Sequence, residues 1–145
     1  MCKREGEPLQ GIEFFNQLYA DEGFCMHLGK VMLSASRLES ELIKYLSQNE
    51  VKEKVHRANL GVLIRIAEKN SLLVKMIPVL KEIKDQRNYL SHNLHALFVG
   101  LIEETVLPRS DLLDSDIDVF TDKAWQLDEN LRGLSDIVAK YNENT

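Results

Sequence analysis

The sequence contains few cysteines, prolines, glycines and tryptophans. It has only 2 cysteines, 3 prolines, 7 glycines and 1 tryptophan among 145 residues. Cys2 and Cys25 form no Cys-x-x-Cys pair and have no histidine at zinc-ligand spacing, so we expect no disulfide framework, no metal site and no cofactor bound through one. The longest apolar runs, such as 97–102, are far shorter than the roughly 20 residues that cross a bilayer. We therefore expect no membrane span.

The first residues do not have the features of a secretory signal peptide. The N-terminus reads MCKREGEP and continues into mixed charge, with no apolar stretch and no small-residue cleavage site, so we expect a cytoplasmic protein. The 44% hydrophobic and 28% charged content is ordinary for a globular chain. At this length we expect a single helical domain over 1–145, with a flexible N-terminus over 1–11.

Charge is distributed unevenly along the chain. The formal net charge is −5, which argues against a general polyanion binder. Residues 50–87 nevertheless carry nine basic and five acidic side chains, whereas residues 103–129 carry nine acidic and two basic ones. One part of the chain could face a polyanion while another part repels it.

Apolar residues recur three or four positions apart through most of the chain, which predicts amphipathic helices and an all-α fold. We expect a four- to five-helix up-down bundle. Its main helices are predicted near 24–46, 58–69, 72–94 and 121–142. The polar stretch 49–54 should end the first of these helices, and 108–120 should form an acidic loop. Residues 94–107 fit either a helical extension or a short hairpin, and we favour the helix.

The ends and faces of these helices can also be predicted. Ser71 and Thr121 are the residue types that cap helix N-termini, so we place them at the starts of the third and fourth helices. Pro78 requires the third helix to start late or to bend. Met32 falls on the apolar stripe of the first helix, and the 72–94 helix is expected to pack between the 24–46 and 121–142 helices.

Common catalytic motifs are missing: the sequence has no GxGxxG, GxxxxGK[ST], HExxH or GxSxG. What stands out is Arg87, because it occupies a position that helical periodicity assigns to a buried stripe continuing through Leu90 and Leu94. An arginine there requires a partner or a crevice. Asn88 and His92 lie four positions apart and share a polar flank of the same helix. Around the helix axis, His92 lies about 140° from Arg87. The two groups could line one groove if another surface closed it.

The segment Arg87-Asn88-Tyr89-Leu90-Ser91-His92 resembles the signature of the HEPN superfamily: arginine, a polar residue, a few variable residues, then histidine. Members are all-α bundles of four or five helices with this motif late in a long helix. Many are metal-independent ribonucleases that act as dimers, with the two motifs meeting at the interface. Others bind nucleotides or are inactive scaffolds. The resemblance therefore implies a HEPN-like endoribonuclease working as a homodimer on RNA.

Carried over position by position, the resemblance makes His92 the proton-transfer group, Arg87 the clamp on the phosphate and Asn88 its polar support. Ser91 and His95, outside the motif, could add hydrogen bonds to a phosphate. The implied reaction leaves a 2′,3′-cyclic phosphate and uses no metal. The implied setting is a toxin of a toxin–antitoxin or phage-defence pair, with an antitoxin protein as partner. In one branch of the family a tyrosine that the antitoxin modifies follows two positions after the histidine, where this chain has Leu94.

Two other classes of function stay open. One is a non-catalytic HEPN-like module that binds a nucleotide or a protein through the same groove, which the negative net charge favours. The other is a helical regulator in which Arg87 forms a structural ion pair, with Glu39 or Glu41 as its predicted partner.

Overall fold

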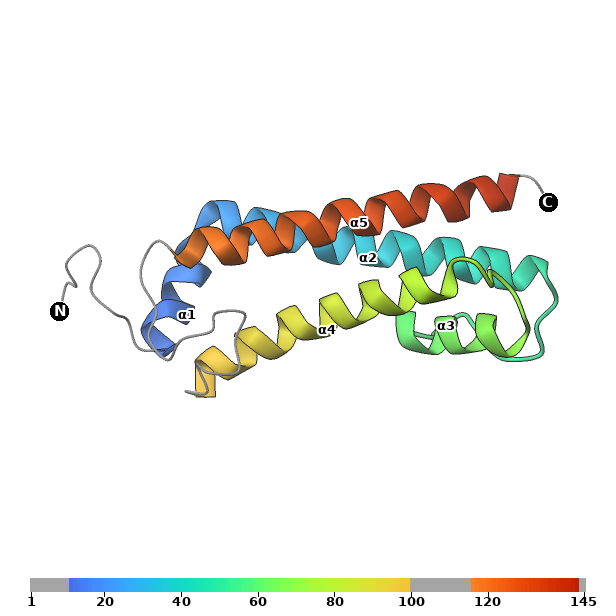
Figure 1. The fold of residues 1–145 in the computed structure, drawn as a ribbon, viewed down its shortest axis with the longest axis horizontal. Helices are drawn as coiled ribbons and strands as arrows, with labels where there is room; N and C mark the ends of the chain where they lie inside the picture. The colour runs from blue at the N-terminus through green and yellow to red at the C-terminus, as the bar shows by residue number, and fades with distance from the viewer. Residues whose placement is uncertain (1–10, 100–115, 144–145) are drawn as a thin grey trace. The chain divides into compact units, whose positions relative to one another are not determined.

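The computed structural model describes residues 11–99 and 116–143, and every regular element in these ranges is a helix (Figure 1). The five helices are α1 (Gly11–Ala20), α2 (Glu22–Gln48), α3 (Leu60–Lys69), α4 (Ile77–Val99) and α5 (Ile117–Glu143). The all-α class and the helix count agree with the sequence prediction. None of the described helices is long and apolar enough to cross a membrane.

The described residues group into two compact units, and the three long helices contribute segments to both. Unit 1 contains α1, α2 up to Lys30, α4 from Arg87 and α5 up to Gln126. Unit 2 contains the rest of α2, α3, α4 up to Gln86 and the rest of α5. The expectation of a single domain over 1–145 stays a prediction.

The core of unit 1 explains why α5 begins earlier than expected. Phe120 is fully buried and its ring lies 5.4 Å from that of Phe14 on α1. Because this contact extends the apolar stripe of α5 backwards by one turn, the helix already starts at Ile117. Thr121 is therefore inside the helix rather than at its cap, and its hydroxyl donates to the Ile117 carbonyl oxygen at 2.9 Å. The predicted acidic loop is wrong over 117–120, and its part over 108–115 lies outside the described residues.

In unit 2, α2 and α5 run in the same direction and contact each other directly (Figure 1). The buried Ser34 hydroxyl donates to Asp128 Oδ1 at 2.5 Å. Further along both helices, Asn142 Nδ2 donates to Glu41 Oε2 at 2.7 Å. On α4, Gln86 accepts from Asn130 of α5 at 3.3 Å. In this unit α4 is therefore a neighbour of α5 and does not separate α5 from α2, contrary to the expectation from sequence.

The connection from α3 to α4 also differs from the prediction. Asn59 caps α3 by accepting from the Val62 N–H at 3.0 Å, as its residue type favours. Ser71 does not cap α4, because Ser71 and Leu73 both adopt positive φ angles of 56° and 53° that end helical geometry. Pro78 lies in the first turn of α4, where its missing N–H has no intrahelical partner to lose. The helix therefore starts late rather than bending.

Three smaller expectations are settled by the described residues. The flexible N-terminus was predicted over 1–11, but Gly11 is already the first residue of α1. The other predicted residues, 1–10, lie outside the described residues. Residues 94–99 are helical, as favoured, while 100–107 fall outside them. Ala35, Leu38 and Leu42 of the predicted α2 stripe are buried, but Met32 is 71% exposed and Val31 beside it is buried in its place.

Candidate functional site

The residues singled out by sequence all lie on the second half of α4, within unit 1. α4 continues as a regular helix from Ile77 to Val99, so residues 87–95 have the helical spacing that the argument from sequence assumed. The long amphipathic helix that carries the motif is thus present, with the motif in its later half.

Four of the five candidate residues form one exposed polar face of α4. Asn88, Ser91, His92 and His95 are all exposed to solvent or half-exposed. Positions i, i+3, i+4 and i+7 lie on the same side of an α-helix, so these side chains are neighbours on one surface. An amide, a hydroxyl and two imidazoles on one face can donate and accept hydrogen bonds, and the imidazoles can also transfer a proton.

Arg87 occupies the flank beside this face. Its side chain is half-buried, in contrast to its exposed neighbour Asn88. Ser91, one turn further on, lies about 40° around the helix from Arg87, whereas His92 lies about 140° from it and about 7.5 Å along the axis. Position 87 therefore adjoins the polar face at Ser91, whereas His92 lies on a different side of the helix. A composite site for both groups requires a second surface.

One buried residue in this segment was missed by the sequence analysis. Asn93 is fully buried, and neither its Nδ2 nor its Oδ1 has a hydrogen-bond partner among the described residues. Leu94, which was predicted to continue the buried stripe, is only half-buried. The stripe runs instead through Leu90, Asn93 and Ala96, all three buried at spacings of three. This spacing indicates that position 93 is buried, but the polar character of asparagine concealed it.

One predicted structural partner of Arg87 is engaged elsewhere. Glu41 accepts the Asn142 amide through Oε2 at 2.7 Å and through its backbone oxygen at 3.1 Å. These two bonds tie α2 to the end of α5 inside unit 2. Glu41 is therefore assigned a packing role in that unit.

No metal-binding group emerges from the part of the chain that the structure describes. Within residues 11–99 and 116–143, no three histidine, cysteine, aspartate or glutamate side chains gather closely enough to hold a metal ion. The chemistry available on α4 is that of Arg87 and of the amide, hydroxyl and imidazole groups beside it. Comparison of the chain with models of known families, with curated proteins and with solved structures finds no match.

Proposed function

We propose that the protein is a HEPN-like endoribonuclease that cleaves RNA through attack of a ribose 2′-hydroxyl on the neighbouring phosphate. The observation that carries the proposal is the polar face of Asn88, Ser91, His92 and His95, bordered by the half-buried Arg87, on one long helix of an all-α bundle. The motif resemblance supplies the reaction type.

The reaction needs two proton transfers and one site of positive charge. The 2′-oxygen loses its proton and bonds to phosphorus, and the bond from phosphorus to the 5′-oxygen breaks as that oxygen takes up a proton. A 2′,3′-cyclic phosphate and a 5′-hydroxyl result. The His92 imidazole can accept or donate the transferred proton, and the Arg87 guanidinium offers paired N–H donors to the extra negative charge on the phosphorane. Asn88 supports the phosphate from the same face as His92.

A second copy of the chain provides the missing wall. In a two-fold dimer formed on this part of α4, the polar face of one copy meets the same face of the other. Two imidazoles then line one cleft, so one can accept the proton of the 2′-hydroxyl while the other donates to the leaving oxygen. The role that goes with this activity is that of a toxin or phage-defence nuclease held in check by an antitoxin protein.

The second candidate is a non-catalytic HEPN-like module that binds a nucleotide or a partner protein through the same face. The net charge of −5 favours it, because a nuclease must approach a polyanion. Both candidates use the same residues, and only turnover separates them.

The test is cleavage of a labelled single-stranded RNA by the full chain in the presence of EDTA. We expect His92→Ala to lower the rate by about 10²–10⁴-fold, the usual contribution of a positioned acid or base. Asn88→Ala should also lower the rate, whereas Asn16→Ala, an exposed asparagine on α1, should leave it unchanged. All three positions are exposed, so the variants should fold normally.

The outcomes separate the two candidates. If the wild-type protein binds a nucleotide or a protein through this face but does not cleave RNA, the module is supported and the nuclease is rejected. If the wild-type protein cleaves RNA and His92→Ala cleaves equally fast, the nuclease site is elsewhere and the proposal fails.

A further inference from the structure

Ion pairs among the described residues leave several basic side chains of unit 2 unneutralised. Three acidic side chains of the 50–87 segment are paired at 3.3, 2.6 and 3.9 Å: Glu53 with Lys69, Glu68 with Lys81 and Asp85 with Lys84. Five basic side chains of the segment form no ion pair with any described residue: Lys52, Lys54, Arg57, Arg65 and Lys75. Within the residues that the structure describes, these five cations are therefore not neutralised by ion pairing.

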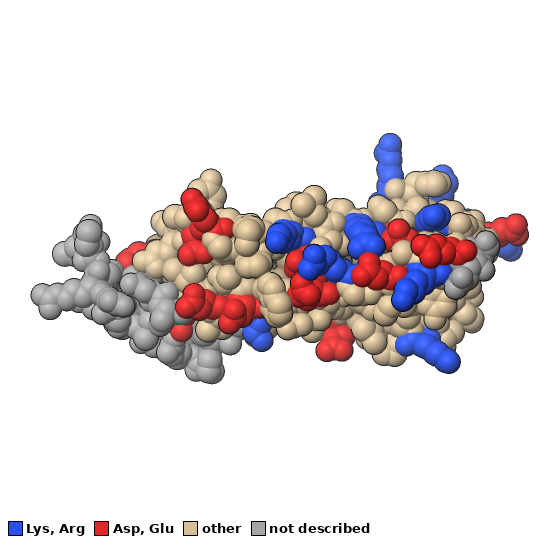
Figure 2. All heavy atoms as spheres, turned by 90° about the horizontal axis from the view of Figure 1, so that it is seen from above, with Lys and Arg blue, Asp and Glu red and all other residues tan. Residues whose placement is uncertain are grey.

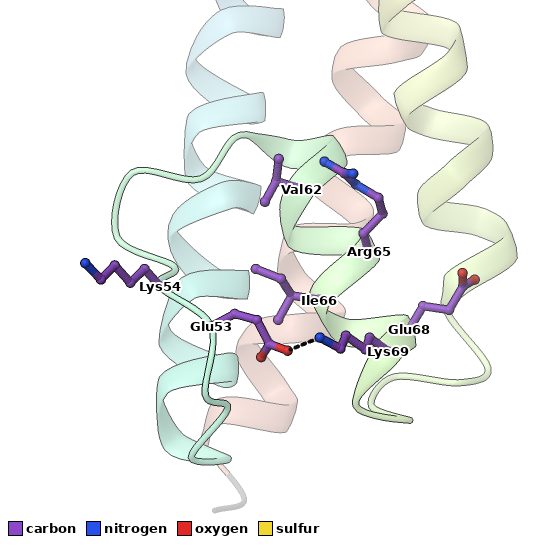
Figure 3. A pocket seen from close by; sticks show the side chains of 7 residues that line it. All are labelled: Glu53, Lys54, Val62, Arg65, Ile66, Glu68 and Lys69. Carbon is purple, nitrogen blue, oxygen red and sulfur yellow. Dashed lines mark ion pairs between the residues drawn. The ribbon is translucent and has the colours of Figure 1, made fainter.

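Three of these cations border two adjoining hollows between α3 and the 49–59 loop that precedes it. One hollow, of about 570 Å³, has Lys54 and Arg65 in its lining (Figure 3). The other, of about 840 Å³, is lined by Lys54 and Arg57. Both hollows share Glu53, Lys54 and Val62, so they form one continuous concave surface. We call this surface the α3 groove.

The loop that forms the α3 groove is held in place by its own contacts. Val55 is 5% exposed and anchors the loop to the core of unit 2. Glu53 accepts Asn70 Nδ2 at 3.1 Å and pairs with Lys69, as the dashed line in Figure 3 marks. Its backbone hydrogen bond, Asn70 and Lys69, in that order, lower the pKa of the Glu53 carboxyl below its usual value. The carboxylate is thus ionised and already engaged, which leaves the neighbouring cations available for an external anion.

The lining indicates the kind of anion. No aromatic side chain other than the His56 imidazole lines either hollow, and the apolar lining is aliphatic, including Val51, Val55 and Val62, so a nucleobase would find little ring surface to stack on. The cations are spread along the rim: in Figure 3 the Lys54 ammonium points away from α3 while the Arg65 guanidinium lies near Val62. Cations that lie apart, on a surface with little aromatic area, can contact successive phosphates of an extended chain. They fit a single compact ligand less well.

The negative net charge does not prevent such contact. Charges separated by more than about 10 Å in 0.1 M salt are largely screened, so the local cations dominate what a nearby phosphate feels. On part of the face drawn in Figure 2, acidic and basic side chains lie interspersed. Exposed pairs such as Arg37 with Asp136 at 2.8 Å neutralise each other.

We infer that the α3 groove binds the phosphate backbone of single-stranded RNA, independently of base sequence, through Lys54, Arg57 and Arg65. The inference deepens the proposed nuclease function and rests on it for the choice of RNA, but the groove belongs to unit 2 and shares no residue with the polar face of α4. In this arrangement the α3 groove holds the RNA chain, and the polar face of α4 cleaves it.

The experiment measures the salt dependence of RNA binding. A fluorescein-labelled oligouridylate is titrated with full-length protein carrying His92→Ala, which prevents cleavage, and anisotropy is recorded over a series of KCl concentrations. Added to this background, the triple variant Lys54→Gln, Arg57→Gln and Arg65→Gln removes the groove cations. The matched control removes three lysines elsewhere, Lys30→Gln, Lys44→Gln and Lys123→Gln, so both proteins have the same net charge.

Each phosphate that the protein no longer neutralises should reduce the slope of log affinity against log salt by about 0.7 for a single strand. The groove variant should therefore have a slope smaller by about 2, while the control keeps the slope of its parent. Equal slopes in the two triple variants overturn the inference. So does a polyglutamate peptide that displaces the RNA at matched charge concentration, because the groove would then be a site for acidic protein.

The two proposals fail separately. Binding with the expected slopes but no cleavage by wild-type protein rejects the nuclease and leaves the groove. Cleavage that depends on His92, with RNA binding unaffected by the groove variant, rejects the groove and leaves the nuclease.

Discussion

Asn93 offers a direct test of how the second half of α4 is built. Its amide is fully buried, and neither polar atom has a hydrogen-bond partner in the part of the chain that the structure describes. Burial of an unpartnered polar group destabilises a protein by about 1–3 kcal/mol. Leucine has no polar atom, so Asn93→Leu removes this penalty, while the larger side chain offsets part of the gain through overpacking.

We expect Asn93→Leu to raise the free energy of unfolding by about 1 kcal/mol, the part of the penalty for an unsatisfied amide that overpacking does not offset. For a chain of this size, the melting temperature should rise by roughly 2–4 °C. Urea and thermal unfolding, followed by far-ultraviolet circular dichroism, measure both quantities. Asn88→Leu is the matched control, because Asn88 is exposed on the same helix and its replacement should change stability by less than about 0.5 kcal/mol.

A fall in stability on Asn93→Leu would refute this reasoning. It would mean that the amide is satisfied in the folded protein, since a partnered amide is destabilised by removal of its hydrogen bonds. Equal effects of Asn93→Leu and Asn88→Leu would also refute it, because burial would then not be the cause.

Two further predictions concern unit 2. Ser34→Ala should lower the unfolding free energy by about 2 kcal/mol, because the Asp128 carboxylate would lose a charge-assisted bond in a buried site, while the exposed Ser36→Ala should have little effect in the same urea titration. The pKa of Glu53 should lie below its ordinary value of 4.5. The bonds of the Glu53 carboxylate to Asn70 and Lys69 therefore stabilise the folded protein above pH 4.5, and this stabilisation is lost as the pH falls through the lowered pKa. An NMR titration in which Asn70→Ala fails to raise this pKa would contradict the assigned cause.

The sequence contains enough information for the helices whose apolar stripe is regular. α2 and α3 were predicted closely because their buried positions recur at helical spacing and their ends coincide with polar residues. The start of α5 was missed because the contact between Phe120 and Phe14 joins residues that are distant in sequence. Pro78 indicated that α4 starts late or bends, but the sequence did not decide between the two, because the positive φ angles at Ser71 and Leu73 that precede the helix are imposed by the connection rather than by residue type.

The candidate site could be predicted only in part, for a physical reason. The helical spacing that puts Asn88 and His92 on one face is a local property, so the sequence reveals it. Asn93 was missed because its burial depends on what packs against α4, and a polar residue carries no hydrophobic signal of that burial. The proposal takes the second wall of the cleft from another copy of the chain, and a single sequence does not place a second copy.

The most direct test of the central proposal is the chemistry of the RNA ends left by the full-length protein in EDTA, read by mass spectrometry. The account predicts a 2′,3′-cyclic phosphate and a 5′-hydroxyl from the wild-type protein and neither product from His92→Ala under the same conditions. Wild-type protein that leaves the RNA intact, or that leaves a 3′-hydroxyl and a 5′-phosphate, would contradict it.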